Sequence, residues 1–285
     1  MPLLDSILNL AVLLLWLNWR SLRLEPLANP IPTTLVGTLK STSPGRFKSW
    51  PPLISLLLLL LLRVVLCREI GSPVDWTPKL DLVFVSLAFR SDTLHTAVLY
   101  SILSSLRLVV VFYFWVLVLV AINQRNTKPD AIEKLLRVHL GRVAHWPWWM
   151  LVLLPMAVAA GLWILVQPLL LHYSLALPAG SVAHLAAQGA VASLGLFLSL
   201  KYLLPGLLLA HLALSYVYLG TNPLWDFISA TSGNLLKPLR RIPLRFGKVD
   251  LAPFAGVLTV MTLFHWIPNL VIGELARRNL TLWPH

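Results

Sequence analysis

The sequence predicts an all-α integral membrane protein, a polytopic bundle of about six transmembrane helices. Of its 285 residues, 58% are hydrophobic and 12% are charged, whereas soluble domains carry about a quarter charged residues. The mean hydropathy is +0.78. The leucine-rich run at residues 56–62 is apolar throughout, as expected where lipid surrounds every face of a helix. It also lacks the apolar–polar alternation of barrel strands.

Six segments approach the length of about 20 apolar residues that a helix needs to cross a bilayer. The first has no basic region and no small-residue cleavage site, so we expect a retained helix and not a signal peptide. In the second, we expect the Arg63 side chain to extend outward to the headgroups. In the fifth, Pro205 and Gly206 predict a kink. The segments are Leu3–Trp19, Pro52–Cys67, Leu99–Asn123, Pro147–Leu171, Ala190–Leu219 and Pro253–Gly273.

Basic residues predict the orientation of this bundle. The loops after the first, third and fifth segments hold five Lys or Arg each, so together they hold fifteen of the 23 in the chain, and residues 173–188 hold none. Basic loops remain in the cytoplasm. We therefore expect a multi-pass membrane protein with cytoplasmic basic loops and both termini outside. Anionic lipid headgroups account for the net charge of +12 without a nucleic acid.

The three basic loops share a pattern that predicts an internal repeat. It runs Gly, basic, apolar, two variable residues, Trp or Ala, then Pro, and it begins at Gly45, Gly141 and Gly247. Glycine permits a turn, and proline is tolerated in the first turn of a helix. We predict a single membrane domain, 1–285, with repeat units at about 1–70, 95–172 and 188–276. The alternative is that these residue types recur at any membrane helix start.

Amphipathic segments are expected on the cytoplasmic side. In the segment 130–143, apolar residues recur at helical spacing, which predicts an interfacial helix. Its polar face carries Glu133, Lys134, Arg137 and Arg142. Phe227, Ile228, Leu235 and Leu236 indicate a similar piece. On the other side, the apolar stretch 80–89 is expected to rest on headgroups or to pack on the bundle.

The third basic loop resembles the signature of the YggT family. The shared pattern is Pro238, an apolar residue, Arg240, Arg241, Pro243, Gly247, and a helix start of Asp250, an apolar residue, a small residue and Pro253. The match covers residues 221 to about 273, with Asn222-Pro223 as the loop opening. The first unit matches in architecture alone, and this chain carries an extra, third unit.

The resemblance implies a small inner-membrane or thylakoid-membrane protein without a defined chemical activity, and we expect this chain in the bacterial inner membrane. The family is linked to cell division, membrane or nucleoid organisation, tolerance of osmotic stress and assembly of membrane complexes. The resemblance carries over Arg240, Arg241, Pro243, Gly247, Asp250 and Pro253 by motif position. With Lys248 of the same loop and two arginines of the middle unit, the expected lipid or partner interface comprises Arg137, Arg142, Arg240, Arg241, Gly247, Lys248, Asp250 and Pro253. Arginine can bind phosphate bidentately, and Asp250 can cap the last helix. The alternative is that these residues serve only topology and capping.

Ionisable residues inside the spans are the other candidates for function. Arg107 and Lys201 each lie 22 residues before a loop proline, so we expect both to reach the outer interface. His211 and His265 would lie at different depths, about 12 and 18 Å, which argues against one shared haem. The single cysteine, Cys67, excludes an internal disulfide.

We therefore predict a protein that is not an enzyme, with no cofactor, metal site or small-molecule substrate. Its expected partners are anionic lipid headgroups and other membrane subunits, in the role of scaffold, accessory or assembly subunit of a larger complex. The alternatives are a small-ion transporter or channel component, since internal repeats are common in transporters, and a haem-bearing electron-transfer subunit.

Overall fold

The computed structural model describes most of the chain and has the predicted all-α architecture. The described residues are 2–24, 50–70, 77–82, 84, 86–89, 93–124, 126, 131–173, 175, 178–217, 220, 222–241, 245–246 and 249–277. Among them, six helical segments are long and apolar enough to cross a membrane. The chain is thus a multi-pass membrane protein. The six segments are Leu3–Leu22, Trp50–Glu69, Leu94–Asn123, Trp148–His172, Val182–Tyr216 and Ala252–Leu275.

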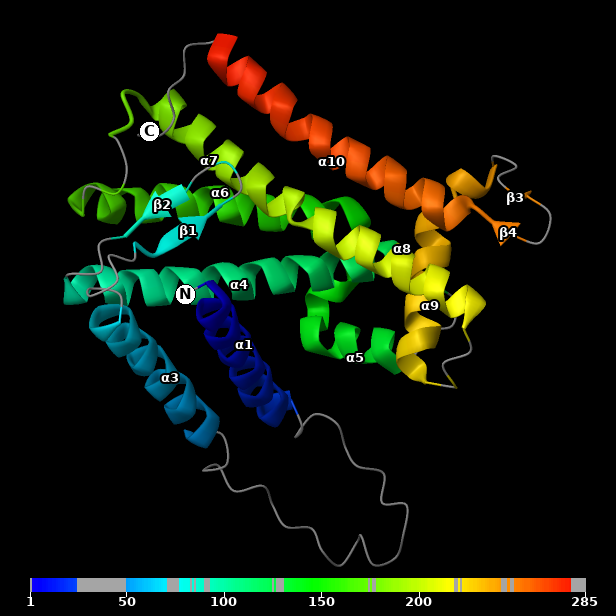
Figure 1. The fold of residues 1–285 in the computed structure, drawn as a ribbon, viewed down its shortest axis with the longest axis horizontal. Coiled ribbons are helices and arrows are strands. Elements are labelled where there is room, and N and C mark those ends of the chain that lie inside the picture. The colour runs from blue at the N-terminus through cyan, green and yellow to red at the C-terminus, as the bar shows by residue number, and fades with distance from the viewer. Residues whose placement is uncertain are drawn as a thin grey trace, which may run out of the picture. The chain divides into compact units, whose positions relative to one another are not determined.

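Two compact units divide the chain, and each is considered separately. Unit 1 contains helix α1 (Pro2–Leu24), helix α3 (Trp50–Glu69) and the part of α4 (Leu94–Asn123) that ends at Val110. Helix α1 packs against α3 (Figure 1). The predicted repeat units are not tested by this division.

Two short strands, β1 (Lys79–Asp81) and β2 (Ser86–Ala88), lie between α3 and α4 and pair with each other. The side chains of Leu80 and Leu87 are buried. The apolar stretch at residues 80–89 therefore contains strands, and Leu80, Leu87 and Phe89 within it are buried, whereas Leu82 and Phe84 are partly buried.

Unit 2 holds the rest of α4 and most of the other elements (Figure 1). Helix α6 packs along α7, α10 packs along α8, and α9 contacts α5, α8 and α10. Two short strands precede α10, and Arg245 pairs with Asp250 in an antiparallel register. The bounds are α5 (Ala131–Leu140), 3₁₀-helix η3 (Gly141–His145), α6 (Trp148–His172), α7 (Val182–Leu198), α8 (Leu200–Tyr216), α9 (Pro223–Leu236), 3₁₀-helix η4 (Leu239–Arg241), β3 (Arg245–Phe246), β4 (Val249–Asp250) and α10 (Ala252–Arg277).

Glycine allows a close contact between α6 and α7 in unit 2. A Cβ atom at Gly189 of α7 would lie 3.0 Å from the backbone oxygen of Ala160 in α6. The side-chain amides of Gln167 and Gln188, both buried, lie within 3.5 Å between the same two helices. Small residues and paired amides are typical of helix contacts inside membranes, where apolar burial alone gives little preference for protein over lipid.

The fifth span breaks at Ser199, six residues before the predicted kink at Pro205. Helix α7 ends at Leu198 and α8 begins at Leu200, and α8 continues through Pro205. The Ser199 hydroxyl donates to the Leu196 carbonyl at 2.7 Å, and the Trp115 indole N–H donates to the Ser199 oxygen at 2.9 Å. Such bonds from serine to the preceding turn compete with helical geometry, which explains why the interruption lies here.

The predicted turn and helix starts are confirmed where the structure describes them. Gly141 has a φ of +58°, a left-handed conformation that glycine adopts without steric cost. Pro147 lies directly before the first residue of α6. Pro52 and Pro253 lie in the first turns of α3 and α10, where the missing N–H has no helical acceptor to lose. Gly45 lies outside the described residues.

The amphipathic helix α5 is confirmed, but the position of one residue, Glu133, was predicted wrongly. Leu136 and Leu140 pack against the core residues Val120, Ala144 and Leu151. Glu133, assigned by the sequence to the polar face, is buried, whereas Leu135 is 58% exposed. Asn126 and Arg137 donate hydrogen bonds to the buried Glu133 carboxylate. The periodicity of α5 alone does not reveal these contacts.

Candidate functional site

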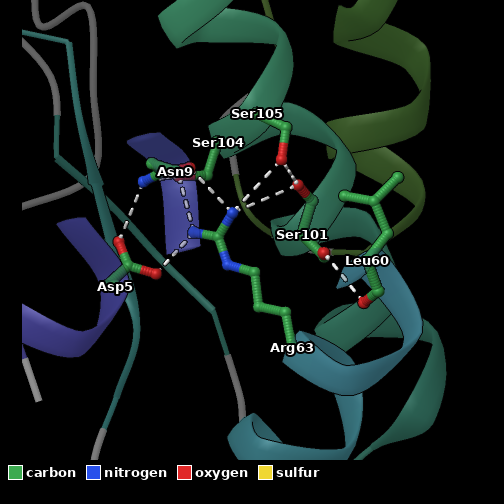
Figure 2. A network of polar contacts seen from close by, with 7 residues as sticks. All are labelled: Asp5, Asn9, Leu60, Arg63, Ser101, Ser104 and Ser105. Carbon is green, nitrogen blue, oxygen red and sulfur yellow. Dashed lines mark hydrogen bonds and ion pairs between the residues drawn. The ribbon is translucent and has the colours of Figure 1, made fainter. Parts of the chain in front are cut away.

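The guanidinium of Arg63 is the most buried charged group described in unit 1. Its side chain is 1% exposed, so the predicted outward extension to the headgroups is wrong. Figure 2 shows the side chain leaving α3 and ending between α1 and α4. An uncompensated charge at this position would be very costly, and the surrounding residues supply the compensation.

One carboxylate neutralises this charge. Nη2 of Arg63 lies 2.5 Å from Oδ1 of Asp5 on α1. Asp5 is 19% exposed, so the carboxylate of the ion pair is more accessible than the guanidinium. On the same face of α1, one turn further along, Asn9 accepts a hydrogen bond from Nη1 of Arg63 at 2.9 Å and donates to Oδ2 of Asp5 at 3.3 Å.

Serine residues of α4 complete the site (Figure 2). The hydroxyl oxygen of Ser104 accepts from Nη2 of Arg63 at 2.8 Å, and that of Ser105 accepts from Nη1 at 3.3 Å. The backbone oxygen of Ser101 lies 3.5 Å from Nη1. These serines are spaced by three and four residues, so they lie on one helix face. We call Asp5, Asn9, Arg63, Ser101, Ser104 and Ser105 the Arg63 cluster.

An aromatic ring covers another side of the guanidinium. The carbon Cζ of Arg63 lies 4.9 Å from the centroid of the Tyr100 ring, within the range of a cation–π interaction. Tyr100 is itself buried and in contact with Phe89. The Arg63 cluster thus joins three helices through ionic, hydrogen-bonding and aromatic contacts.

A small cavity lies beside the ion pair. Its volume is about 10 Å³, and Asp5, Arg63 and Cys67 line it together with apolar side chains of α1 and α3. This volume corresponds to about one water molecule. The cavity therefore has room for about one water molecule beside the Asp5 carboxylate.

Positions counted along the sequence indicate that the residues of this cluster lie at a common depth. Arg63 lies six residues before the end of α3, and Asn9 and Ser101 each lie seven residues after the start of their helices. At a rise of 1.5 Å per residue, all three are about 9–11 Å from the same end of consecutive antiparallel spans. Equal depth along the three helices, together with the spacing of Asp5 and Asn9 by four residues, predicts that these polar groups lie close together.

A second polar group lies in unit 2, where α4 ends. Asn123 is 1% exposed and Thr231 is fully buried, and the Asn123 amide donates to the Thr231 hydroxyl at 2.8 Å. Asn234 donates to the side-chain oxygens of Asn123 and Asn126 at 2.9 and 3.0 Å. We call Asn123, Asn126, Glu133, Thr231 and Asn234 the Asn123 cluster.

A charged pair, Glu133 and Arg137, lies at the edge of the Asn123 cluster. Asn126 lies 3.4 Å from one oxygen of Glu133, and Arg137 donates to the other oxygen at 2.5 Å. Arg137 is 30% exposed. One of the predicted interface arginines is therefore already paired within the protein.

The remaining predicted interface residues occupy several elements of unit 2. Arg142 on η3 and Arg240 on η4 are exposed, while Pro253 is buried in the first turn of α10. Helix η4 contacts α10, and η3 contacts α5, so Arg240 and Arg142 belong to two separate contact regions. Arg241 lies on η4 without a described side chain, and Gly247 and Lys248 lie outside the described residues.

The N-cap position of α10 lies one residue after Asp250, the residue predicted to cap this helix. The Leu251 carbonyl accepts the first helical bond, from Ala255 N–H at 2.9 Å, so Leu251 occupies the N-cap position. Asp250 lies one residue earlier, in β4. Its side chain is not among those described, and capping by Asp250 stays a prediction.

The other ionisable residues of the spans do not form a described cluster. Arg107 is exposed on α4, near the middle of that helix. The Lys201 ammonium lies 4.9 Å from the ring centroid of its neighbour Tyr202. His211 is half-buried on α8, and His265 is exposed on α10. Within the described part of the chain, no three His, Cys, Asp or Glu side chains are grouped as metal ligands would be.

Comparisons with known proteins provide no relative for this chain. No protein-family model matches it, and neither a curated protein nor a solved structure does.

Proposed function

We propose that the protein is a non-catalytic scaffold or accessory subunit of a larger membrane complex, similar in role to YggT-like proteins. The observation that carries this proposal is the Arg63 cluster. Its arginine is 1% exposed and bound by groups of α1 and α4. This arrangement uses an intramembrane charge to hold helices together, which suits a protein whose task is to present a stable surface.

The exposed groups of unit 2 offer a surface for such a task. Arg142 on η3 is exposed, and so are Trp148 and Trp149 at the start of α6. Arg240 on η4 adds a second exposed arginine. Arginine beside tryptophan suits the boundary between phospholipid headgroups and hydrocarbon. We place the protein in a bacterial inner membrane, with these residues on the cytoplasmic side, where anionic lipids and partner subunits would meet them.

Purification of the full chain in mild detergent tests this proposal. We expect other membrane subunits to co-purify at constant stoichiometry. Arg142→Glu combined with Arg240→Glu should remove them, because both substitutions reverse the charge of the exposed surface. Lys79→Glu is the matched control, since Lys79 is exposed on the loop predicted to face outside. A stable chain that purifies without any other subunit would contradict the proposal.

A second candidate function is a transporter or channel component, and the same ion pair favours it. Intramembrane ionisable residues are often part of ion or proton pathways, and Asp5 is more accessible than Arg63. Ion flux in proteoliposomes distinguishes the two candidates. Flux that is abolished by Asp5→Asn, Arg107→Ala or Lys201→Ala in a correctly folded protein would favour transport over scaffolding.

A further inference from the structure

Helix α10 carries polar side chains on the face that points away from the rest of unit 2. Thr262, His265 and Asn269 are exposed. At 100° per residue they fall within an arc of about 60°. Gly256, which contacts Leu208 and Leu236, and Phe264, which stacks on Phe197, define the packed face of the same helix. The polar side chains lie roughly opposite these two residues.

Depth makes this face unusual. Thr262 and Asn269 lie about 15 and 26 Å from the start of a helix about 38 Å long, so the polar residues occupy its central part. Among the described residues, Thr262, His265 and Asn269 have no hydrogen-bond partner outside their own turn of helix. An amide and an imidazole facing lipid at mid-membrane depth are costly without a partner.

A small residue continues the same face toward the end of the helix. Gly273 lies one turn after Asn269 and is exposed, and a Cβ atom there would meet nothing within 4 Å. Small residues allow two membrane helices to approach closely, and polar side chains then bond across the interface. We call Thr262, His265, Asn269 and Gly273 the α10 stripe.

We propose that the α10 stripe binds the α10 stripe of a second copy of this chain, forming a parallel dimer inside the membrane. The threonine hydroxyl, the neutral imidazole and the asparagine amide each contain both a donor and an acceptor, so the stripe is complementary to itself. It also has no carboxylate or fixed cation that would repel an identical surface. Two copies inserted in the same orientation are related by a twofold axis along the membrane normal, which places each stripe residue opposite its equivalent. The inference does not depend on the proposed scaffold function.

Cysteine cross-linking of the full chain in lipid vesicles tests the geometry. In a Cys67→Ala background, Thr262→Cys should give a disulfide-linked dimer on mild copper oxidation, because a disulfide requires Cα atoms about 4.4–6.8 Å apart. Leu263→Cys is the matched control: Leu263 is 53% exposed, but it lies about 100° around the helix from Thr262. A dimer from Thr262→Cys alone supports the proposal. Monomers from both variants, equal dimers from both, or a cross-link to a different protein would overturn it.

Association measured by energy transfer between labelled copies tests the chemistry. Asn269→Leu should raise the dissociation constant of the dimer roughly tenfold, the usual scale for interhelical polar bonds. Asn269→Gln should restore association, because it keeps a donor and an acceptor. Leu270→Ala, a change at a neighbouring exposed residue away from the stripe, should leave the constant unchanged. Equal association by wild type and Asn269→Leu, with both folded to the same unfolding midpoint, would refute the role of the stripe.

Discussion

The Arg63 cluster of unit 1 and the Asn123 cluster of unit 2 place polar groups inside the protein in different ways. The Arg63 cluster centres on a full positive charge, which one carboxylate neutralises and neutral acceptors surround. The Asn123 cluster centres on uncharged amides and a hydroxyl. Its charged pair, Glu133 with Arg137, lies at the edge and includes a side chain that is 30% exposed.

Depth along the helices accounts for this difference. Arg63 lies about 9 Å inside the end of α3, and Asn123 is the last residue of α4. A charge held away from water requires an opposite charge and well-placed hydrogen bonds, whereas a helix end leaves free carbonyls and donors that neutral amides can satisfy. The comparison predicts that the stability of unit 1 depends mainly on neutralising a buried charge. The stability of unit 2 should depend mainly on hydrogen bonding.

Breaking the ion pair of unit 1 should have the largest effect. Asp5→Asn removes the negative charge and leaves the Arg63 guanidinium buried without compensation, and Arg63→Met leaves the Asp5 carboxylate without its cation. We expect each substitution to lower the free energy of unfolding by about 3–5 kcal/mol. Unfolding of the purified protein in mixed micelles, followed by tryptophan fluorescence, measures the loss. A loss below about 1 kcal/mol for Asp5→Asn would show that Arg63 is compensated in another way.

Removing the central amide of unit 2 should have an intermediate effect. Asn123→Leu deprives Thr231 and Asn234 of their partner, and stranded buried polar groups cost about 1–3 kcal/mol. The same micelle unfolding experiment measures this change. Asn18→Leu is a useful control, because it is the same substitution at an exposed position on α1, outside the Asn123 cluster. Equal losses for the two variants would contradict a specific role for the Asn123 cluster.

The charge of Glu133 should contribute least among the single changes. Glu133→Gln keeps an acceptor for Arg137 and for Asn126, and Arg137 can turn toward solvent because it is 30% exposed. We expect a loss of about 1 kcal/mol, because Glu133 is only 1% exposed but glutamine keeps its hydrogen bonds and Arg137 is partly exposed. The decisive comparison is with Asp5→Asn, which is the same chemical change in unit 1. A loss for Glu133→Gln as large as that for Asp5→Asn would remove the distinction between the two clusters.

Patterns along a single helix predicted most of the fold, and contacts between helices account for most of what was missed. The six spans, the amphipathic helix α5 and the turn at Gly141 follow from local hydrophobicity and glycine conformation. The burial of Arg63 depends on residues from two other helices, so hydropathy of its own span suggested the opposite. The break at Ser199 likewise involves Trp115 of α4. The stretch at residues 80–89 is too short and apolar for its period to separate strand from helix.

Replacing both members of the ion pair together should have the smallest net effect and is the sharpest test of the comparison. Asp5→Leu with Arg63→Met removes both charges and fills their space with apolar side chains. Such replacements of buried pairs are often neutral or stabilising, so we expect a change within about 1 kcal/mol of wild type. The coupling energy of the double-mutant cycle, with Asp5→Leu and Arg63→Met as its single variants, should then be several kcal/mol. A double variant that is as unstable as the sum of the single variants would mean that Asp5 and Arg63 act independently. In that case the loss of stability would come mainly from the serine and asparagine side chains, which lose their hydrogen-bond partners in the double variant. Hydrogen bonding would then be the main source of stability in both clusters.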